Sequence, residues 1–262
     1  MHLSVVIPAY NEEQRIIKSL IKVEDYLARQ NYSSEVLVID DGSNDDTELL
    51  VRAFSEIHPR IRLLKNPCNQ GKGSAVQRGI LNAKGEYVLF TDADLSAPVE
   101  EVERLFYWVY QGYEVVIGSR NIFDPVVNID SFFIRKFISS VFNSIVRLFA
   151  LPQFHDTQCG FKLFKNETAQ KLFSLQKFMG FSFDVEILYI AIKNGIKCKE
   201  VAVNWKHCPA GKVQIVRDSI RMFKDIIQIK KLHKETEIRG EVTTFSEGEV
   251  RQQGLALSVR GK

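Results

Sequence analysis

Leu3-Ser4-Val5-Val6-Ile7-Pro8-Ala9-Tyr10-Asn11-Glu12 is the stretch that decides the fold, because a short apolar run ends there in polar residues. A run of this length, rich in β-branched residues and bounded by a turn, predicts a buried strand. The pattern returns at Glu35–Asp40 and at Tyr87–Thr91. Amphipathic stretches of helical length separate these runs. We therefore expect an α/β protein with a mostly parallel sheet, flanked by helices and built from right-handed βαβ units.

The same reasoning extends over the first 120 residues. Strands are predicted at Leu3–Ile7, Glu35–Asp40, Ile61–Lys65, Tyr87–Thr91 and Glu114–Gly118. Helices are predicted at Glu12–Arg29, Asp45–Ile57, Gly73–Ala83 and Pro98–Gln111. Several of these helices follow Asn, Ser or Asp residues, which are suited to N-caps.

The composition is that of an ordinary globular protein. With 45% hydrophobic and 26% charged residues in 262, it excludes collagen, coiled coils and wholesale disorder. No apolar run reaches 18 residues and no signal-peptide pattern is visible, so we expect a cytoplasmic protein without a transmembrane helix. Cys68, Cys159, Cys198 and Cys208 form no CxxC pair, which predicts reduced structural thiols.

The charge is unevenly distributed. Residues 197–234 carry a local net charge of +7 and the rest of the chain −4, which indicates an anionic partner for this region. Two segments, Asp130–Leu151 and Val213–Lys234, combine bulky apolar residues with Lys and Arg. They fit interfacial amphipathic helices, or equally helices whose apolar faces pack on the sheet. Residues 235–262 have few bulky side chains and are expected to form a mobile polar tail.

Three polar clusters directly follow predicted strands: Pro8–Glu12, Asp40–Ser43 and Asp92–Ser96. The carboxyl ends of parallel strands share one edge of a sheet, where ligands bind, so the clusters should meet. Each alone could cap a helix or form a turn. Together they indicate a site, and Asp92-Ala93-Asp94 suits a divalent metal that carries phosphates. In Asn69–Gly73 the glycines allow close backbone approach and Lys72 can meet a diphosphate.

In their order and spacing, these four motifs resemble the motif set of the family 2 glycosyltransferases, which have the GT-A fold with its Rossmann-like sheet. Three later motifs, Gly118–Arg120, Asp156–Lys162 and Phe183–Glu186, are similar to the dolichyl-phosphate β-glucosyltransferase branch, close to the dolichyl-phosphate mannose synthases. The resemblance covers about residues 3 to 230.

The resemblance implies an inverting enzyme that moves glucose from UDP-glucose to a polyprenyl phosphate, with Mg²⁺ or Mn²⁺ as cofactor. It implies a transferase domain over residues 1–234, with a nucleotide-binding half (1–120) and an acceptor and membrane-facing half (121–234). Such a protein would associate peripherally with the cytoplasmic face of a membrane, where the amphipathic segments would contact anionic lipid.

The resemblance also implies a role for each matching residue. The nucleotide would contact Pro8, Ala9, Tyr10, Glu12, Asp40, Asp41, Gly71, Lys72, Ala93 and Lys212. The metal would bind Asp92, Asp94 and Ser96, and the sugar pocket would contain Asp156, Gln158, Asp184 and Glu186. Arg120 and Arg135 would grip the acceptor phosphate. The catalytic group would comprise Asp92, Asp94, Arg120, Arg135 and Asp184.

Several alternatives remain at this point. The enzyme could use GDP-mannose, or a soluble or polysaccharide acceptor. A protein of another class, a nucleotide-sugar-binding scaffold without turnover, is disfavoured by the intact Asp92/Asp94 pair. Nucleic-acid binding is disfavoured because the basic residues of 197–234 alternate with aliphatic rather than stacking aromatic residues.

Overall fold

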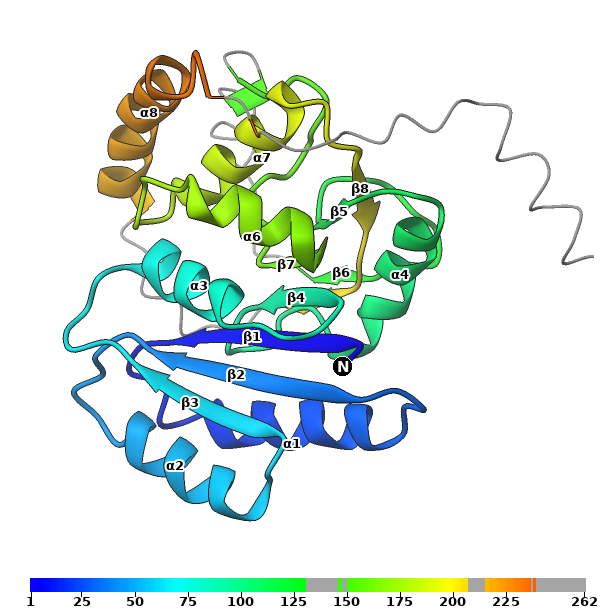
Figure 1. Cartoon of the computed structure of the whole chain (residues 1–262), viewed down its shortest axis with the longest axis vertical. Helices are drawn as coiled ribbons and strands as arrows, with labels where there is room; N and C mark the ends of the chain where they lie inside the picture. Colours follow the sequence, from blue (N-terminus) through cyan, green and yellow to red (C-terminus); the bar gives the residue numbers. More distant parts are fainter. Residues whose placement is uncertain (131–145, 148–149, 207–214, 237, 239–262) are drawn as a thin grey trace, which may run out of the picture.

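The computed structural model describes residues 1–130, 146–147, 150–206, 215–236 and 238. Its centre is a seven-stranded sheet with the order β3-β2-β1-β4-β7-β5-β8 (Figure 1). The strands are β1 (Leu3–Ala9), β2 (Ser34–Asp40), β3 (Ile61–Lys65), β4 (Tyr87–Thr91), β5 (Val115–Ser119), β7 (Phe161–Lys165) and β8 (Cys198–Ala202). Two short strands, β6 (Ile129–Asp130) and β9 (Trp205–Lys206), form a separate parallel pair.

Helices cover both faces of the sheet. They are α1 (Ile16–Ala28), α2 (Thr47–Ile57), α3 (Lys72–Leu81), the 3₁₀ turn η1 (Val99–Glu101), α4 (Val102–Tyr110), α6 (Asn166–Ser174), α7 (Phe183–Lys193) and α8 (Ile215–Leu232). One core lies between the sheet and α1, α2 and α4; the other lies between the sheet and α3, α6, α7 and α8. Alternation along β1 explains the division, because Val5 and Ile7 enter the first core and Val6 the second.

Strand β7 is antiparallel to both its neighbours, β4 and β5, while the other four neighbouring pairs in this sheet are parallel. An antiparallel strand begins at the edge of the sheet where its two neighbours end. The segment just before β7, residues 156–160, therefore reaches the same edge of the sheet as the loop after β4. Residues 70 positions apart in the sequence are joined in this way, as shown by Thr91 opposite Phe161.

The predicted α/β fold with a mostly parallel sheet is confirmed, and all five predicted strands lie within two residues of β1–β5. The starts of α1, α2, α3 and α4 have no side-chain cap hydrogen bond, so the N-caps predicted for several of these helices are not observed. Helix α1 also begins four residues later than predicted. Asn11 has a left-handed φ of 53°, and the Glu12 amide donates to Thr47 Oγ1 at 2.7 Å, so the chain is fixed in a loop here.

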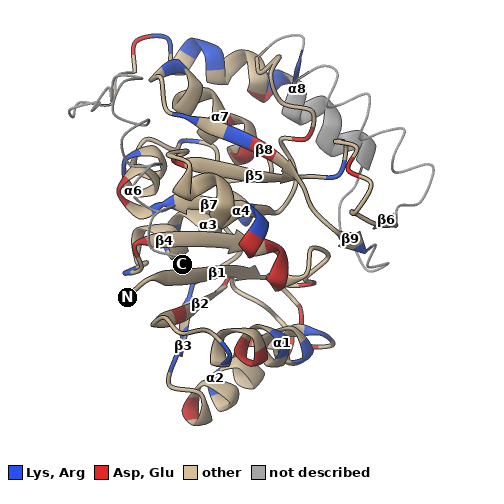
Figure 2. Cartoon of the chain, turned by 90° about the vertical axis from the view of Figure 1, so that its right-hand side faces the viewer, with Lys and Arg blue, Asp and Glu red and all other residues tan. Residues whose placement is uncertain are grey.

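Only parts of the two amphipathic segments are described. In the first, Val146 and Leu151 are buried in the core. In α8, Ile226 and Ile229 are buried, whereas Ile227 and Leu232 are 55% and 58% exposed on the same helix as exposed Lys224 and Lys231. Figure 2 shows positions of Lys and Arg in blue on the described part of α8. Packing on the core, one of the two readings of these segments, is thus observed for the inner face of α8. No helix within the described ranges is long and apolar enough to cross a membrane.

The predicted thiols and tail are partly described. Cys68, Cys159 and Cys198 are free cysteines, as expected, while Cys208 lies outside the described residues. Of the predicted tail, only residues 235, 236 and 238 are described, and Ile238 donates its amide to Asn194 Oδ1 at 2.7 Å.

Candidate active site

The loops that follow β1, β2, β3 and β4 meet at one edge of the sheet, which we call the polar edge (residues 10–15, 41–46, 66–71 and 92–98). Backbone contacts join these loops. The Asp41 amide donates to Ala9 O at 2.8 Å, and the Asn11 amide donates to Ser43 Oγ at 2.9 Å. The third cluster, Asp92–Ser96, follows β4, which pairs in parallel with β1, so all three clusters predicted to meet lie at this edge. Pro8, Ala9 and Tyr10 lie at the end of β1, with Ala9 buried and the other two partly exposed.

Asp40 and Asp41, at the end of β2, differ in their hydrogen bonding. Asp41 accepts three hydrogen bonds from the loop after β3: from Asn66 Nδ2 at 2.7 Å, from the Gln70 amide at 3.1 Å and from the Gly71 amide at 2.8 Å. Asp40 Oδ1 accepts from the Ser43 amide, but Asp40 Oδ2 is buried and has no hydrogen-bond partner within the described chain. A buried carboxylate oxygen without a donor is costly, so Asp40 is the residue here that suits an external N–H or O–H group.

The loop after β3 places Lys72 at the first turn of α3. Gly71 precedes it with φ +101°, and a Cβ at Gly71 would lie 2.5 Å from the carbonyl oxygen of Met179. Both the backbone conformation and the close approach require glycine at this position. Lys72 Nζ lies 2.7 Å from Asp92 Oδ1 and 5.3 Å from the centre of the Phe90 ring. Burial would lower the pKa of Lys72, but the charges of Asp92 and Asp184 outweigh burial and raise it.

The Asp92–Ser96 loop follows β4. Asp94 Oδ1 accepts the Ser96 amide at 2.9 Å, and Leu95 between them has a φ of +46°. A left-handed leucine is uncommon, and such residues occur often at functional sites. Ala93 contributes its carbonyl oxygen, which accepts from Ser19 Oγ at 2.6 Å on α1.

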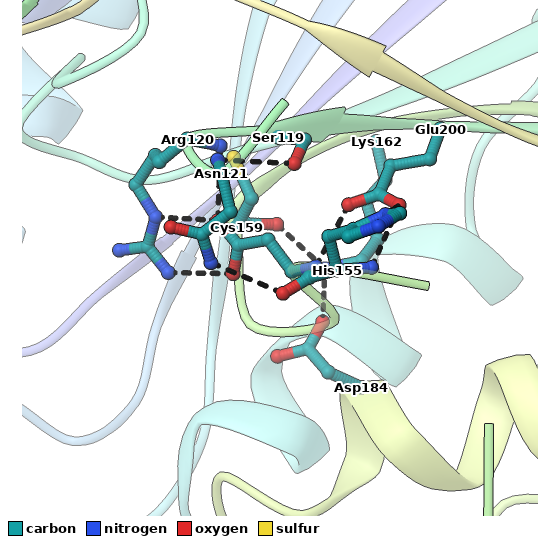
Figure 3. Close-up of polar contacts among 9 residues, drawn as sticks. Ser119, Arg120, Asn121, His155, Cys159, Lys162, Asp184 and Glu200 are labelled. Atoms are coloured by element: carbon teal, nitrogen blue, oxygen red, sulfur yellow. Dashed lines mark hydrogen bonds and ion pairs between the residues drawn. The ribbon is translucent and has the colours of Figure 1, made fainter. Parts of the chain in front are cut away.

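A second group of charges forms the ion-pair cluster (Arg120, Asp156, Lys162 and Asp184), of which Figure 3 labels Arg120, Lys162 and Asp184. Arg120 donates to both oxygens of Asp156, at 2.6 and 2.8 Å, and its guanidinium lies 4.9 Å from the Trp205 ring centre. Burial would raise the pKa of Asp156, but Arg120 outweighs it and the pKa is lowered. Asp156 thus fixes the direction of Arg120.

Lys162 and Asp184 form the other half of this cluster. Their side chains are each 2% exposed, and Lys162 Nζ donates to Asp184 Oδ1 at 2.5 Å and to Cys159 O at 2.6 Å (Figure 3). Burial raises the pKa of Asp184, and the charges of Lys162 and Lys72 only partly offset that effect. Asp92 also acts on Arg120, Lys72 and Asp184, so the polar edge and the ion-pair cluster share one electrostatic environment.

Other predicted site residues have contacts elsewhere. Glu12 pairs with Arg15 at the start of α1. Glu186 is buried, accepts the amides of Lys177 and Phe178, and lies 2.7 Å from His233 Nε2, so its contacts are with a loop and the end of α8 rather than with Asp92. Gln158 Nε2 is buried without a hydrogen-bond partner among the described residues. Arg135 and Lys212 lie outside the described residues.

Several residues of the site were not singled out from the sequence. Lys162 and Trp205 are examples, because each acts through a partner far away in the chain. One signal for Lys162 exists in Phe161-Lys162-Leu163-Phe164, where a lysine interrupts an apolar strand. Because a buried lysine requires a carboxylate partner, this pattern indicates a buried ion pair.

The polar edge also fits a divalent cation. The described residues contain no group of three or more His, Cys, Asp and Glu side chains that could hold a metal ion. A magnesium or manganese ion that carries substrate phosphates, however, needs only one or two protein carboxylates. Asp92 and Asp94 can supply these, and the Lys72 ammonium 2.7 Å from Asp92 indicates that a positive charge is favourable at this place.

Comparison with known families gives a clear result. Residues 4–173 match the family described as glycosyl transferase family 2. Among curated proteins, the dolichyl-phosphate beta-glucosyltransferase of Dictyostelium discoideum is 38% identical over 242 residues, which is 88% of this chain and 74% of that protein. The enzymes of the same name from Saccharomyces cerevisiae and Homo sapiens are 34% and 32% identical, with 87% and 74% of the respective chains covered in each case.

Solved structures show the same fold. Glucosyl-3-phosphoglycerate synthase from Mycobacterium tuberculosis, in complex with UDP, has a TM-score of 0.61 with 21% identity and covers 89% of this chain and 79% of its own. The same synthase with Mn²⁺, UDP and glucosyl-3-phosphoglycerate has a TM-score of 0.62 with 20% identity and covers 88% and 79%. At this level of identity the likeness concerns the fold alone.

Proposed function

Because the chain belongs to glycosyl transferase family 2, an enzyme family, we propose that it transfers glucose from UDP-glucose to a polyprenyl phosphate with inversion at the anomeric carbon. The relatives named dolichyl-phosphate beta-glucosyltransferase support this choice of donor and acceptor. We assign the donor to residues 1–120 and the acceptor and membrane contacts to residues 121–234, within one transferase domain.

The observation that carries this proposal is that Asp92 pairs with one cation, Lys72, and acts electrostatically on a second, Arg120. Lys72, at the start of α3 next to the polar edge, lies 2.7 Å from Asp92 Oδ1. The charge of Asp92 also contributes to the raised pKa of Arg120, in the ion-pair cluster. A donor diphosphate next to Lys72 and an acceptor phosphate next to Arg120 would therefore meet at the Asp92–Asp94 loop. A transferase requires this adjacency of its two substrates.

The donor would lie along the polar edge. The orphaned Oδ2 of Asp40 suits an N–H group of the base, and Tyr10 and Glu12 lie at the neighbouring strand end. Asp92 and Asp94 would hold Mg²⁺ or Mn²⁺, which neutralises charge that develops on the leaving diphosphate. Lys72 would contribute a second positive charge there. Position 71 accepts only glycine, and the absence of a side chain there would allow the backbone to approach the phosphates.

The transfer needs no proton abstraction from the acceptor. A phosphate oxygen is already anionic at neutral pH, and it would attack the anomeric carbon while the bond to the UDP oxygen breaks and the electron pair leaves with UDP. A single displacement on an α-linked donor gives a β-linked product. The protein's contribution is orientation, since Arg120, held by Asp156, can present a phosphate with charge-assisted hydrogen bonds. Arg135 would provide a second contact.

The acceptor's isoprenoid tail places the reaction at a membrane surface. The described part of α8 supports this, because exposed Ile227 and Leu232 lie on the same helix as exposed Lys224 and Lys231. Apolar side chains flanked by lysine suit an interface with anionic lipid. We therefore include peripheral association with anionic membranes in the proposal, with the chain working at the cytoplasmic face.

An assay with purified protein tests the proposal. UDP-glucose, GDP-mannose and other nucleotide sugars are incubated with Mn²⁺ or Mg²⁺ and a short polyprenyl phosphate, and the glycolipid is identified by mass spectrometry and its anomer by NMR. We expect β-glucosyl phosphate lipid from UDP-glucose, lost in chelator. Asp94→Asn should reduce the rate at least ~100-fold, because charge on the diphosphate is no longer neutralised.

Asp25→Asn is the matched control, since Asp25 is exposed and lies toward the end of α1 that is away from the polar edge. It should keep the wild-type rate. Glucose transfer only to a soluble phosphate or a polysaccharide would refute the acceptor assignment, and full activity in chelator would refute the metal role.

A further inference from the structure

Gly160, the residue just before β7, lies against one side of the Asp92 carboxylate. Thr91 and Phe161 are opposite each other in the β4–β7 pair, so Asp92 and Gly160 are the next pair along. The Asp92 amide donates to the carbonyl oxygen of Gly160 at 3.1 Å. The two backbones are therefore fixed relative to each other at the point where β4 enters the polar edge.

Gly160 has no side chain because the Asp92 side chain occupies that space. A Cβ built on Gly160 would lie 2.0 Å from Asp92 Oδ2, 2.4 Å from Cγ and 2.7 Å from Oδ1. Real Cβ atoms essentially never approach closer than 3.0 Å. These three nearest atoms all belong to one carboxyl group, so an added methyl group would directly displace that group.

The backbone conformation does not explain this glycine. The described glycines with left-handed φ are Gly42, Gly71, Gly112 and Gly195, and Gly160 is not among them. Any residue could adopt the backbone of Gly160, so the requirement for glycine comes from its neighbour. This separates Gly160 from Gly71, where conformation and contact both matter.

The opposite side of the carboxylate meets Lys72, whose Nζ lies 2.7 Å from Oδ1. Lys72 is itself placed over the Phe90 ring, at 5.3 Å, and Lys162 lies over the same ring at 5.7 Å. Asp92 is thus confined between Gly160 and Lys72, with 26% of its side chain left exposed. Displacing the carboxyl group away from Gly160 would therefore alter its contact with Lys72.

We propose that Gly160 is a positioning residue, which fixes the Asp92 carboxylate where it can hold the cation of the donor complex. The inference rests on the proposed function and adds to it a residue that has no side chain to contact substrate. Gly160→Ala must move the carboxylate or the strand end by about 1 Å, and displacements of that size can cost ~100-fold in rate.

The first test measures UDP affinity by calorimetry with Mn²⁺ and again in chelator. In the wild type, Mn²⁺ should raise the affinity for UDP. In Gly160→Ala we expect this increase to be at least ~10-fold smaller, while the affinity for UDP in chelator stays within about twofold of wild type. Gly180→Ala is the control, because a Cβ there has no atom within 4 Å and its φ is not left-handed. If Mn²⁺ raises the UDP affinity of Gly160→Ala as much as that of the wild type, the inference is overturned. The transfer assay would still support the proposed function.

The second test needs no substrate, and so separates failure of this inference from failure of the proposed function. Thermal unfolding is compared for wild type, Gly160→Ala, Asp92→Ala and the double variant. Gly160→Ala should lower Tm in the wild-type background but much less in the Asp92→Ala background, where the displaced atoms are gone. If Gly160→Ala alone does not fold, recovery in the double variant supports the same conclusion. Equal lowering of Tm, or equal failure to fold, in both backgrounds would overturn it.

Discussion

At Asp41, on the polar edge, most of the hydrogen bonds to the carboxylate come from backbone amides, whereas in the ion-pair cluster charged side chains hold Asp156 and Asp184. Asp41 accepts two backbone amides and one side-chain amide from a single loop. Asp156 and Asp184 instead take the charges of Arg120 and Lys162 in places with little or no exposure. The first arrangement depends on loop shape, and the second depends on charge balance. The two regions should therefore respond differently to substitutions that keep shape but change charge.

Breaking the buried pair should have the largest effect. Lys162→Met leaves the Asp184 carboxylate buried without its cation, so we expect the free energy of unfolding to fall by ~3–5 kcal/mol in urea denaturation. Lys171→Met, in an exposed pair with Glu167, should change it by less than ~1 kcal/mol. The double variant Lys162→Met/Asp184→Leu should recover much of the loss. Equal effects of the buried and exposed single variants would contradict the comparison.

Asp41→Asn tests the polar edge. The asparagine side chain keeps the shape of the aspartate, but one of its two acceptor oxygens becomes an NH₂ donor. That donor faces the backbone N–H group of Gln70 or Gly71, so a hydrogen bond is lost, which should cost ~1–3 kcal/mol of stability. UDP affinity should fall as well, because the loop that carries Lys72 is loosened. Calorimetric titration and urea denaturation measure the two effects, with Asp25→Asn as control. Unchanged UDP affinity at reduced stability would mean that this loop does not contact the donor.

Arg120→Lys distinguishes the substrates. The lysine keeps the charge near Asp156 but loses the bidentate fork, so the KM for lipid phosphate should rise about tenfold while UDP affinity stays constant. Arg52→Lys, exposed on α2, should leave both values unchanged. A fall in donor affinity with unaltered acceptor KM would move Arg120 from the acceptor to the donor side.

The smallest effect is expected at the membrane. Lys231→Gln removes one exposed positive charge from α8 and should weaken binding to anionic vesicles by about fivefold, since one such charge contributes ~1 kcal/mol. Lys22→Gln, exposed on α1, has the same charge change and should have no effect. Vesicle sedimentation at rising salt measures both. Equal weakening by the two variants would indicate a general charge effect rather than a contact by α8.

The polar edge could be predicted from the sequence because each of its polar clusters is adjacent in the sequence to the strand that positions it. Each strand run ends in its own polar cluster, and the rule that parallel strands share an edge brings the clusters together. The motif resemblance added the family, which the matches confirm. The predicted strands were accurate for the same reason, while the start of α1 was wrong because Glu12 bonds to Thr47, 35 residues away.

The ion-pair cluster could not be derived in this way. Arg120 and Asp156 are 36 residues apart, and Lys162 and Asp184 are 22 apart, so no periodic pattern joins them. Their meeting depends on the antiparallel placement of β7 between β4 and β5, which alternation of strands and helices does not indicate. The resemblance gave Asp156, Asp184 and Glu186 one shared role in a sugar pocket. Those roles stay predictions, and in this structure the three carboxylates have three different sets of partners.

The placement of β7 also has a consequence for the newly made chain. Strand β4 ends at Thr91, but the strand that completes its pairing begins at Phe161. During synthesis, β4 therefore emerges with one hydrogen-bonding edge open, and β5 cannot close that edge because β7 belongs between them. An open, apolar strand edge is a template for pairing with other chains. Nascent chains stalled or truncated before about residue 165 should consequently be the species of this protein most prone to aggregate and most dependent on chaperones.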